Sequence, residues 1–551
     1  MRQARGDATL ADVAARWARK RPAALALEVG DEAFSYRELD ELGRAAAAHL
    51  SRLGARSGDV VALVGANSVA YVALLLGGAR RGVTLALVHP ELGAEPLAQA
   101  LAAAGVTRVL CERALCEVVA AATTLPVTDF DPALRAPFAA AAGDDQGFAA
   151  DRASRDLALV YTSGTTGLPK ACRLPHTRVL AAACLFGAPL YDFRADDKLL
   201  CVLPLYHGSP LMLGLGACLA TGTPLHLERR FSASELLSTA ARCRATALLY
   251  VGDLGRMLLA TPPSSRDRAH PLRLAVGNGM AAEVWTAFQQ RFGIAHVHEF
   301  YAATESPVGL LNLSGRVGSV GNLPQAWMFG LKLVRLDHES GELLRDGRGE
   351  LVECGVDEPG ELLVRARQRG LGVYHGYVER ADTEARLVRS TSGAMLFRTG
   401  DVLRRDREGF YYFVERRGDS YRFRGENVSV QLVERELLEV EGVQAALVTG
   451  VSVPGYDGLL GLAVLVCCAD FDVSRLHVLG QRLPKSALPR FVRLISELPR
   501  TSSLKLRRRS LAAEGVDPER VLGELWVLVG GRYTRLEAEI YRDISSGALR
   551  L

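Results

Sequence analysis

The sequence predicts an α/β protein with a large N-terminal domain of two α/β layers and a β-rich lobe, followed by a small α+β C-terminal domain. Apolar strand-like runs alternate with helix-like runs through the first two thirds of the chain, which is the pattern of βαβ units. Short alternating runs begin near Lys332, and the pattern changes again beyond Arg417. With 551 residues the chain is also too long for one hydrophobic core, so two or more domains are expected.

The N-terminal segment predicts an amphipathic surface helix, because apolar residues recur at helical spacing at Leu10, Val13, Ala14 and Trp17. Beyond it, strands are expected at 59–65, 83–88 and 106–111, and helices at 68–80 and 95–105. Since parallel strands are joined by helical crossovers, these elements predict a mostly parallel sheet. A similar alternation between Leu199 and Ile294 predicts the second layer.

The last third of the chain is expected to be richer in strands. The runs KLVRLD, GELLVRA and GFYYFVERR predict the β-rich lobe. Downstream, ENVSVQLVERELLEV predicts a strand that enters a helix, and QAALVTGVSV and GLAVLVCC predict two further strands. The intervening ERRGDSYRFRG is charged, glycine-rich and poor in apolar residues, so it is the predicted linker. We therefore expect one domain at 1–416 and a second at 417–551.

Composition excludes several classes of protein. The 66 basic and 62 acidic residues nearly cancel, which argues against a dedicated nucleic-acid binder. The ten cysteines show no zinc-ligand spacing and fit a reducing cytoplasm. The N-terminal segment lacks the apolar core of a signal peptide, and no apolar run is long enough to cross a membrane.

The sharpest local signal is LVYTSGTTGLPK at 159–170, where an apolar strand runs into glycines and hydroxyl residues before Lys170. Small residues let the backbone approach a ligand, and the N–H and hydroxyl groups suit phosphate oxygens. The segment is not a Walker A motif, because GxxxxGK[ST] is absent and ACRLPH reads as a strand. Taken alone, it is either a polyphosphate loop or a plain flexible hairpin.

Four ordered blocks resemble the adenylate-forming superfamily of acyl-CoA synthetases, luciferases and peptide-synthetase adenylation domains. They are YTSGTTGLPK, the YAATE at 301–305, the FRTGD at 397–401 and the LPRTSSL at 498–504 before Lys505. GNGM at 277–280, RFRGENVSV and the ending AEIYRDISSGALRL resemble its fatty-acid transport protein and very-long-chain acyl-CoA synthetase branch. Relatives in this branch often carry a membrane segment. None is visible here, so membrane contact is expected to be peripheral at most.

The resemblance implies a nucleotide site. The phosphate loop is expected to comprise Thr162, Ser163, Gly164, Thr165, Thr166, Gly167 and Lys170, which hold the β- and γ-phosphates. Further nucleotide contacts are expected from Glu299, Phe300 and Tyr301, from Asp401 to the ribose, from Phe413 to the adenine, and from Arg416 to ribose or phosphate. Without the resemblance, Asp401 reads as a turn aspartate and Arg416 as a solvated strand end.

The expected catalytic residues are Lys505, Thr304 and Glu305. Lys505 bridges the attacking carboxylate and the α-phosphate, which Thr304 also contacts. Glu305 binds Mg²⁺, a hard cation that takes oxygen ligands. Without the resemblance, Glu305 is a helix-cap residue, and Lys505 belongs to a basic face with the three arginines that follow it.

The expected acyl pocket contains His207 and the turn Gly277, Asn278 and Gly279. His207 is either a gate to the pocket or a satisfied core histidine. Without the resemblance, the Gly-Asn-Gly turn requires only tolerance of positive φ. The resemblance also makes the C-terminal domain mobile, with a hinge at Arg417, Gly418 and Asp419, and Gly425 leaves room for a thiol tunnel.

The sequence thus predicts an AMP-forming acid-thiol ligase that uses ATP, Mg²⁺ and coenzyme A and activates a fatty or bulky lipophilic acid. Two alternatives stay open: an acyl-AMP ligase that loads an acyl carrier protein, and a fatty-acid uptake protein with weak catalysis. Two departures from the family pattern are Ala302, where relatives have glycine, and Asn427, where many have arginine.

Overall fold

The computed structural model describes residues 8–131, 155–163, 169–323, 326–337, 342–370, 372–416, 420–423, 426–454, 456, 459–499 and 508–551. The chain forms two compact units, each described by itself below. Unit 1 comprises Met1–Lys332, Leu363–Thr399 and Arg405–Tyr412, and unit 2 comprises Leu333–Leu362, Gly400–Arg404 and Phe413–Leu551.

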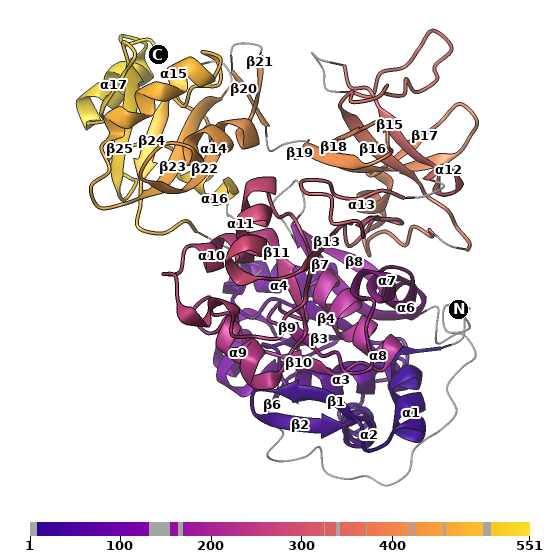
Figure 1. Ribbon diagram of the computed structural model, residues 1–551. Coiled ribbons are helices and arrows are strands. Elements are labelled where there is room, and N and C mark those ends of the chain that lie inside the picture. Colours follow the sequence, from indigo (N-terminus) through magenta and orange to yellow (C-terminus); the bar gives the residue numbers. More distant parts are fainter. Residues whose placement is uncertain are drawn as a thin grey trace. The chain divides into compact units, whose positions relative to one another are not determined.

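The first layer of unit 1 is a six-stranded sheet in the order β6-β5-β3-β4-β7-β8 (Figure 1). Its strands are β3 (Val60–Val64), β4 (Thr84–Val88), β5 (Arg108–Glu112), β6 (Val127–Phe130), β7 (Asp156–Ser163) and β8 (Pro169–Pro175). All neighbours are parallel except β7 and β8, which form an antiparallel pair. The predicted parallel sheet and the predicted strand at ACRLPH are therefore confirmed.

The second layer is an eight-stranded sheet in the order β14-β13-β12-β11-β9-β10-β1-β2. Its strands are β1 (Leu25–Val29), β2 (Glu32–Ser35), β9 (Leu199–Cys201), β10 (Leu225–Leu227), β11 (Ala247–Val251), β12 (Leu274–Asn278), β13 (His296–Tyr301) and β14 (Leu310–Asn312). The edge strands β2 and β14 are antiparallel to their neighbours, and the others run parallel. The N-terminal strand β1 belongs to this second layer, where Leu27 lies opposite Leu225.

Helices follow the strands along the chain in unit 1. They are α1 (Leu10–Lys20), α2 (Tyr36–Arg52), α3 (Val69–Arg81), α4 (Ala94–Ala103), η2 (Arg113–Leu115), α5 (Cys116–Ala122), α6 (His176–Ala182), the π-helical η4 (Ala183–Gly187), α7 (Ala188–Tyr191), the π-helical η5 (Pro210–Gly216), α8 (Ala217–Thr221), α9 (Leu236–Cys243), α10 (Gly252–Leu259), η6 (Ser265–Arg268), α11 (Ala282–Phe292), α12 (Ala326–Phe329) and α13 (Arg380–Glu384).

Two of these helices show how the sequence sets their ends and packing. Helix α1 begins with a capping box, in which Thr9 and Asp12 satisfy each other's backbone N–H groups. Helix α3 is apolar nearly all round and buried along most of its length. It packs closely on α2, because a Cβ atom on Gly77 would lie 2.7 Å from the Cβ of Ala46.

The predicted β-rich lobe is a five-stranded sheet in the order β15-β16-β18-β17, with β19 paired to β18. Its strands are β15 (Leu331–Val334), β16 (Gly360–Arg365), β17 (Leu387–Arg389), β18 (Met395–Arg405) and β19 (Tyr411–Arg416). Strands β15, β16, β18 and β19 each contain residues of both units, so the division between the units falls within this sheet.

The C-terminal part of unit 2 is an α+β fold around a sheet in the order β22-β23-β24-β25-β26 (Figure 1). Its strands are β22 (Val443–Val451), β23 (Leu460–Cys467), β24 (Phe491–Leu494), β25 (Glu524–Val529) and β26 (Arg532–Arg535), and its helices are α14 (Val430–Leu438), η7 (Val473–Val478), α15 (Leu479–Arg482), α16 (Arg508–Glu514) and α17 (Ala538–Ser546). The predicted small α+β domain is confirmed in its fold class.

The predicted linker ERRGDSYRFRG was wrong over part of its length. Residues Ser420–Phe423 form strand β20, which pairs with β21 (Glu426–Ser429) in an antiparallel hairpin. Tyr421 is 3% exposed in the core of unit 2. Gly450 and Gly461 make room for this ring, because a Cβ on either would lie within 2.4 Å of a Tyr421 side-chain atom. Tyr421 and, on the paired strand, Val428 anchor the hairpin in this core.

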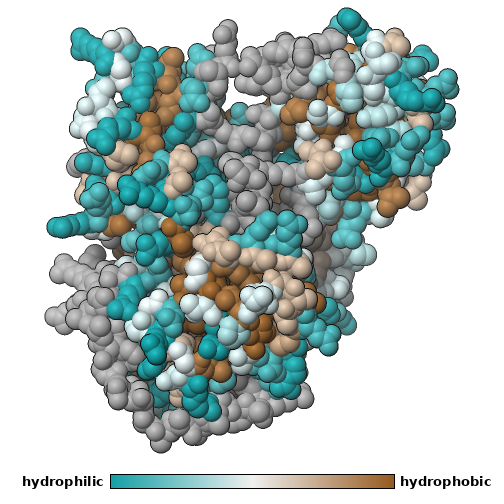
Figure 2. Space-filling model, turned by 180° about the vertical axis from the view of Figure 1, so that it is seen from behind, coloured by the Kyte–Doolittle hydropathy of each residue, from teal (hydrophilic) through white to brown (hydrophobic). Residues whose placement is uncertain are grey.

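Among the residues that the structure describes, no helix is both long enough and apolar enough to cross a bilayer. Seen from behind in Figure 2, the lower part of the molecule exposes an area of apolar residues among hydrophilic ones.

Candidate active site

The carboxyl ends of three neighbouring parallel strands, β11, β12 and β13, form the centre of the site in unit 1. Gly277 near the end of β12 lies opposite Tyr250 on β11 and opposite Glu299 on β13. In open α/β sheets, ligands bind outside the carboxyl ends of the strands. The predicted Gly277–Gly279 turn and the predicted Glu299, Phe300 and Tyr301 thus meet at one edge of the second layer.

Glu299 stabilises the turn that follows β12. Its Oε1 accepts hydrogen bonds from the Met280 N–H at 2.7 Å and from the Tyr250 hydroxyl at 2.9 Å, and its Oε2 accepts one from the Gly279 N–H at 3.3 Å. The carboxyl group is buried, and this burial raises the pKa of Glu299 to about 7. Within unit 1 its carboxylate is therefore directed at the turn.

Gly277 and Gly279 must both be glycine in this turn, each for a different reason. A Cβ on Gly277 would lie 2.3 Å from the Tyr250 carbonyl oxygen, so no side chain fits there. Gly279 has φ +81° and open space around it, so its requirement is conformational. Opposite the turn, a Cβ on Gly252 would lie 1.8 Å from the Gly279 carbonyl oxygen. The backbone at Gly252 therefore lies so close to the backbone at Gly279 that no side chain fits at Gly252.

The loop between β13 and β14 carries Thr304 and Glu305, both half-buried. The Tyr377 hydroxyl donates to Glu305 Oε1 at 2.9 Å. Arg178 Nη2 donates to the carbonyl oxygens of Thr304 and Ser306. Both the main chain and the carboxylate of this loop are thus held by side chains from elsewhere in unit 1.

Residues 206–208 lie against the same loop. A Cβ on Gly208 would lie 2.8 Å from Thr304 Oγ1, so the two segments are in contact. His207 packs its ring 4.7 Å from that of Tyr206, which itself lies 5.1 Å from the ring of His89. The structure therefore brings the predicted His207 next to the predicted Thr304.

The described ends of the phosphate loop are the strands β7 and β8. Thr162 lies opposite Lys170, and Ser163 lies opposite Pro169, in the antiparallel ladder. Lys170 Nζ forms an ion pair with Asp382 Oδ1 at 2.6 Å. The side chains of Lys170 and Asp382 are 16% and 26% exposed, so the pair is partly shielded from water.

In unit 2, Asp401 and Arg416 bind each other. Arg416 Nε lies 2.6 Å from Asp401 Oδ1, and Arg416 Nη2 lies 3.0 Å from Asp401 Oδ2. This two-pronged geometry is the strong arrangement for arginine and a carboxylate. Asp401 is 1% exposed, whereas Arg416 is 52% exposed and Phe413 on the same strand is half-buried.

A family model described as AMP-binding enzyme matches residues 14–378, which contain the described strand ends and loops of the unit 1 site. The chain belongs to the family of AMP-binding enzymes. The resemblance to the adenylate-forming superfamily is thereby confirmed, and the curated relatives below confirm its fatty-acid transport protein branch.

Curated relatives of this AMP-binding enzyme extend along nearly the whole chain. Human long-chain fatty acid transport protein 1 is 34% identical over 554 residues, covering 94% of this chain and 84% of the relative. The medium/long-chain fatty acid CoA ligase FadD6 of Mycobacterium tuberculosis is 33% identical over 539 residues, covering 95% and 88%.

Solved structures share the fold. ATP-bound MatB from Rhodopseudomonas palustris superposes with a TM-score of 0.75 at 26% identity, covering 91% of this chain and 98% of that one. A benzoate CoA ligase from Burkholderia xenovorans reaches a TM-score of 0.77 at 22% identity, covering 92% and 100%. The predicted fold class is confirmed by these likenesses.

Several predicted site residues of the AMP-binding enzyme lie outside the described residues. They are Gly164, Thr165, Thr166 and Gly167 of the phosphate loop, Arg417, Gly418 and Asp419 of the hinge, Gly425 of the thiol tunnel, and the catalytic Lys505. Their roles stay predictions.

Glu305 fits a Mg²⁺ ligand. One oxygen of its carboxylate is oriented by Tyr377, and within the described part of the chain Oε2 makes no hydrogen bond or ion pair. No group of three or more His, Cys, Asp or Glu residues that would hold a metal alone occurs among the described residues. A cation at this position would therefore take further oxygen ligands from a bound substrate or water.

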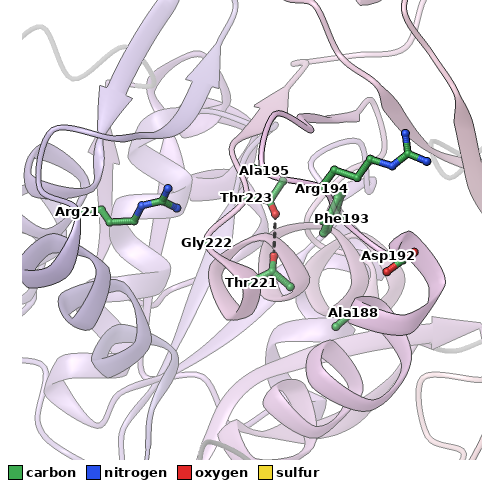
Figure 3. A pocket seen from close by; sticks show the side chains of 9 residues that line it. All are labelled: Arg21, Ala188, Asp192, Phe193, Arg194, Ala195, Thr221, Gly222 and Thr223. Atoms are coloured by element: carbon green, nitrogen blue, oxygen red, sulfur yellow. Dashed lines mark hydrogen bonds between the residues drawn. The ribbon is translucent and has the colours of Figure 1, made fainter.

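A pocket of about 320 Å³ lies elsewhere on unit 1 (Figure 3). It is lined by Arg21, Ala188, Asp192, Phe193, Arg194, Ala195, Thr221, Gly222 and Thr223. Helices α7 and α8 both end there, and the hydroxyl of Thr221 donates to that of Thr223 at 3.0 Å. None of the predicted site residues lines this pocket, so we place the active site at the strand ends.

Four residues around the site were not singled out from the sequence: Tyr250, Tyr377, Asp382 and Arg178. Tyr250 stands at the end of an apolar strand, a position where polar groups often serve a site. Arg178 is the one charged residue in the apolar run RVLAAACLF, which was an available signal. Tyr377 and Asp382 reach the site only through the tertiary fold.

Proposed function

We propose that this AMP-binding enzyme is an ATP-dependent, AMP-forming acyl-CoA synthetase that activates a fatty acid and transfers it to coenzyme A. One observation carries the proposal. The Tyr206–Gly208 segment, the Gly277–Gly279 turn and the Thr304–Glu305 loop lie at or beyond the carboxyl ends of strands β9, β12 and β13 of one sheet, and Gly208 contacts Thr304, in a chain of this family. These groups suit an α-phosphate and its counter-ion beside a carboxylic acid.

In the first step, a carboxylate oxygen of the acid bonds to the α-phosphorus of ATP, and the bond from that phosphorus to the bridging oxygen breaks. Pyrophosphate leaves and acyl-AMP remains. The protein's contribution to such a transfer is positioning and charge stabilisation. Thr304 donates to the α-phosphate, the 162–170 loop holds the departing phosphates, and Lys505 neutralises charge between the carboxylate and phosphorus.

In the second step, the sulfur of coenzyme A attacks the acyl carbon, the bond from that carbon to the phosphate oxygen breaks, and AMP leaves. A different set of groups is needed around the same intermediate. Rotation of the C-terminal domain about residues 417–419 supplies them, and Gly425 leaves space for the pantetheine arm.

Mg²⁺ would be held by Glu305 together with phosphate oxygens, and it would spread the negative charge of the polyphosphate. The residues of this chain that serve it are Tyr377, which fixes one carboxylate oxygen, and the loop that carries Glu305.

The names of two relatives, which specify long-chain and medium/long-chain fatty acids, support a fatty acid as the substrate. The segment after His207 is apolar: Leu211, Met212, Leu213 and Leu215 are all buried in or beside the π-helical η5. We place the enzyme in the cytoplasm, with peripheral membrane contact at most.

Acid-dependent exchange of pyrophosphate into ATP, measured over acids of two to twenty-four carbons, tests the first step. We expect exchange with medium or long chains and saturable thioester formation with free coenzyme A. If the thioester formed only on a carrier protein, the acceptor would be that protein and not coenzyme A. Absence of exchange with every acid would refute the proposal. Lys505→Ala should abolish exchange while sparing transfer from supplied acyl-AMP.

A further inference from the structure

The main chain of the Thr304–Glu305 loop is held by the cationic side chain of Arg178, a half-buried residue. Arg178 lies in helix α6, and its Nη2 donates to the carbonyl oxygen of Ser306 at 2.6 Å and to that of Thr304. The two accepting carbonyls flank Glu305 in the chain. A single nitrogen therefore fixes the main chain on both sides of the residue expected to bind the metal.

Arg178 is costly to keep at this position. Its Nε is buried and has no hydrogen-bond partner within the described residues. No carboxylate in the described part of the chain lies within ion-pair distance of it, and the charge of Glu305 attracts it only from farther away. A largely desolvated charge without a directly paired carboxylate opposes folding, and apolar side chains of similar volume usually serve stability better. An arginine at this position therefore indicates a requirement other than stability.

The other contacts of the Thr304–Glu305 loop indicate which requirement the arginine meets. Tyr377 orients the Glu305 carboxylate, and Gly208 lets the 206–208 segment approach Thr304 Oγ1. These contacts set the two side chains, but neither fixes the backbone from which they project. The planar guanidinium supplies that constraint, because it can donate to two carbonyls from one rigid group.

We propose that Arg178 is a positioning residue for adenylation: it holds the 304–306 main chain so that Thr304 meets the α-phosphate and Glu305 meets Mg²⁺. This inference rests on the proposed function. It predicts that losing Arg178 harms the step that needs Mg²⁺ and the polyphosphate far more than the transfer of a preformed acyl group to the thiol.

The test compares the wild type with Arg178→Met, which keeps length and bulk but removes the donors, and with Arg178→Lys, which keeps the charge and is the fallback if the Met variant does not fold. Arg173→Met is the matched control. Arg173 lies five residues earlier, and its side chain is 51% exposed and pairs with Asp156 at 2.8 Å. Folding of each variant is checked by its Tm.

Three quantities are measured with the acid that the wild type activates fastest: pyrophosphate exchange, the Mg²⁺ concentration that half-saturates exchange, and thioester formation from supplied acyl-AMP. For Arg178→Met we expect exchange to fall by about 10- to 100-fold, because small misplacements cost that much in positioned reactions. The half-saturating Mg²⁺ concentration should rise by about 10-fold. Thioester formation should change by less than about threefold.

Equal losses in both half-reactions, or an unchanged Mg²⁺ requirement in a folded variant, would refute the positioning role, because a structural residue only lowers the active fraction. Arg178→Lys should fall between the Met variant and the wild type; a Lys variant as active as the wild type would also refute it. Failure of the proposed function is distinguishable, since the wild type itself would then show no acid-dependent exchange.

Discussion

Arg416 binds the Asp401 carboxylate through two nitrogens, at 2.6 Å and 3.0 Å, and Asp401 is almost completely buried. A carboxylate held in this way has its orientation fixed before any ligand arrives. If Asp401 accepts the ribose hydroxyls, as proposed, Arg416 determines the direction in which the carboxylate presents its remaining acceptor sites.

Asp401→Asn should therefore raise the KM for ATP by about 10- to 100-fold, since hydrogen bonds to charged groups contribute roughly 1.5–3 kcal/mol. The KM for the acid should change little. Steady-state kinetics with each substrate varied separately checks this. The control is Asp357→Asn, which breaks the exposed pair with Arg404. Equal rises in the two KM values would contradict a role in binding the nucleotide.

Lys170 and Asp382 are paired at 2.6 Å, so if Lys170 binds the terminal phosphates, as proposed, Asp382 competes with them. Asp382→Asn removes the competing charge, so we expect the KM for ATP to fall, by about two- to fivefold for a partly exposed pair. Glu384→Gln, which breaks the exposed pair with Arg380 on the same helix, should leave the KM unchanged. A higher KM in the Asp382 variant would mean that the pair orients Lys170 for the phosphate instead.

Glu299 makes stability depend on pH. Its pKa is raised from 4.5 to about 7 by burial, so between these values the folded state binds more protons than the unfolded state. Stability should consequently fall as pH rises from about 4.5 to about 7. Glu299→Gln has no such charge, and its Tm relative to the wild type should rise across this window and stay level above it. Each pKa unit is worth about 1.4 kcal/mol, so a rise of about 2.5 units corresponds to an effect of roughly 2–4 kcal/mol.

Thermal unfolding at pH 5, 6, 7 and 8 measures this difference. Glu283→Gln, on the exposed face of α11, provides the comparison. A Tm difference for Glu299→Gln that stays constant from pH 5 to pH 8 would show that Glu299 does not titrate in this window.

His226 also makes stability fall as pH rises, but over a higher pH range. Burial lowers the pKa of His226, but its two ring nitrogens pair with the carboxylates of Glu28 and Glu228, each at 3.0 Å, and such pairing favours the charged ring, whose pKa is raised to about 10. A raised pKa in the folded state stabilises the protein fully below about 6.5, and the contribution is lost as pH rises through about 10. His226→Gln should therefore lower Tm more at pH 6 than at pH 10.5. The exposed His477→Gln should show no such difference, and an equal loss at both pH values would contradict a charged His226.

The layers of the fold could be predicted because buried parallel strands and their crossover helices leave a strong periodic pattern. The runs at 59–65, 83–88 and 106–111 all became neighbouring or near-neighbouring strands of one sheet. The partner of the N-terminal strand could not be predicted, because pairing between Leu27 and Leu225 leaves no local signal. The linker prediction failed at Tyr421 for the same reason, since its burial depends on two distant glycines.

The site residues also fall into two groups, those that the sequence could identify and those that only the structure reveals. Thr304 and Glu305 could be named from a short motif, and the strand ends place them beside the glycine turn. The residues that hold them, Arg178 and Tyr377, are separated from the loop by 126 and 72 positions in the chain. Their role follows from three-dimensional packing alone, which a single sequence does not contain.

The seating of β1 in the second layer has a consequence for synthesis of the chain. Leu27 leaves the ribosome almost two hundred residues before Leu225, so β1 can pair only with β2 while the first layer is made. Helix α1 waits as well, because the Trp17 indole donates to the carbonyl of Leu219. The faces of β1 and α1 that pack on the second layer therefore lack those partners until residues 219–225 have been synthesised.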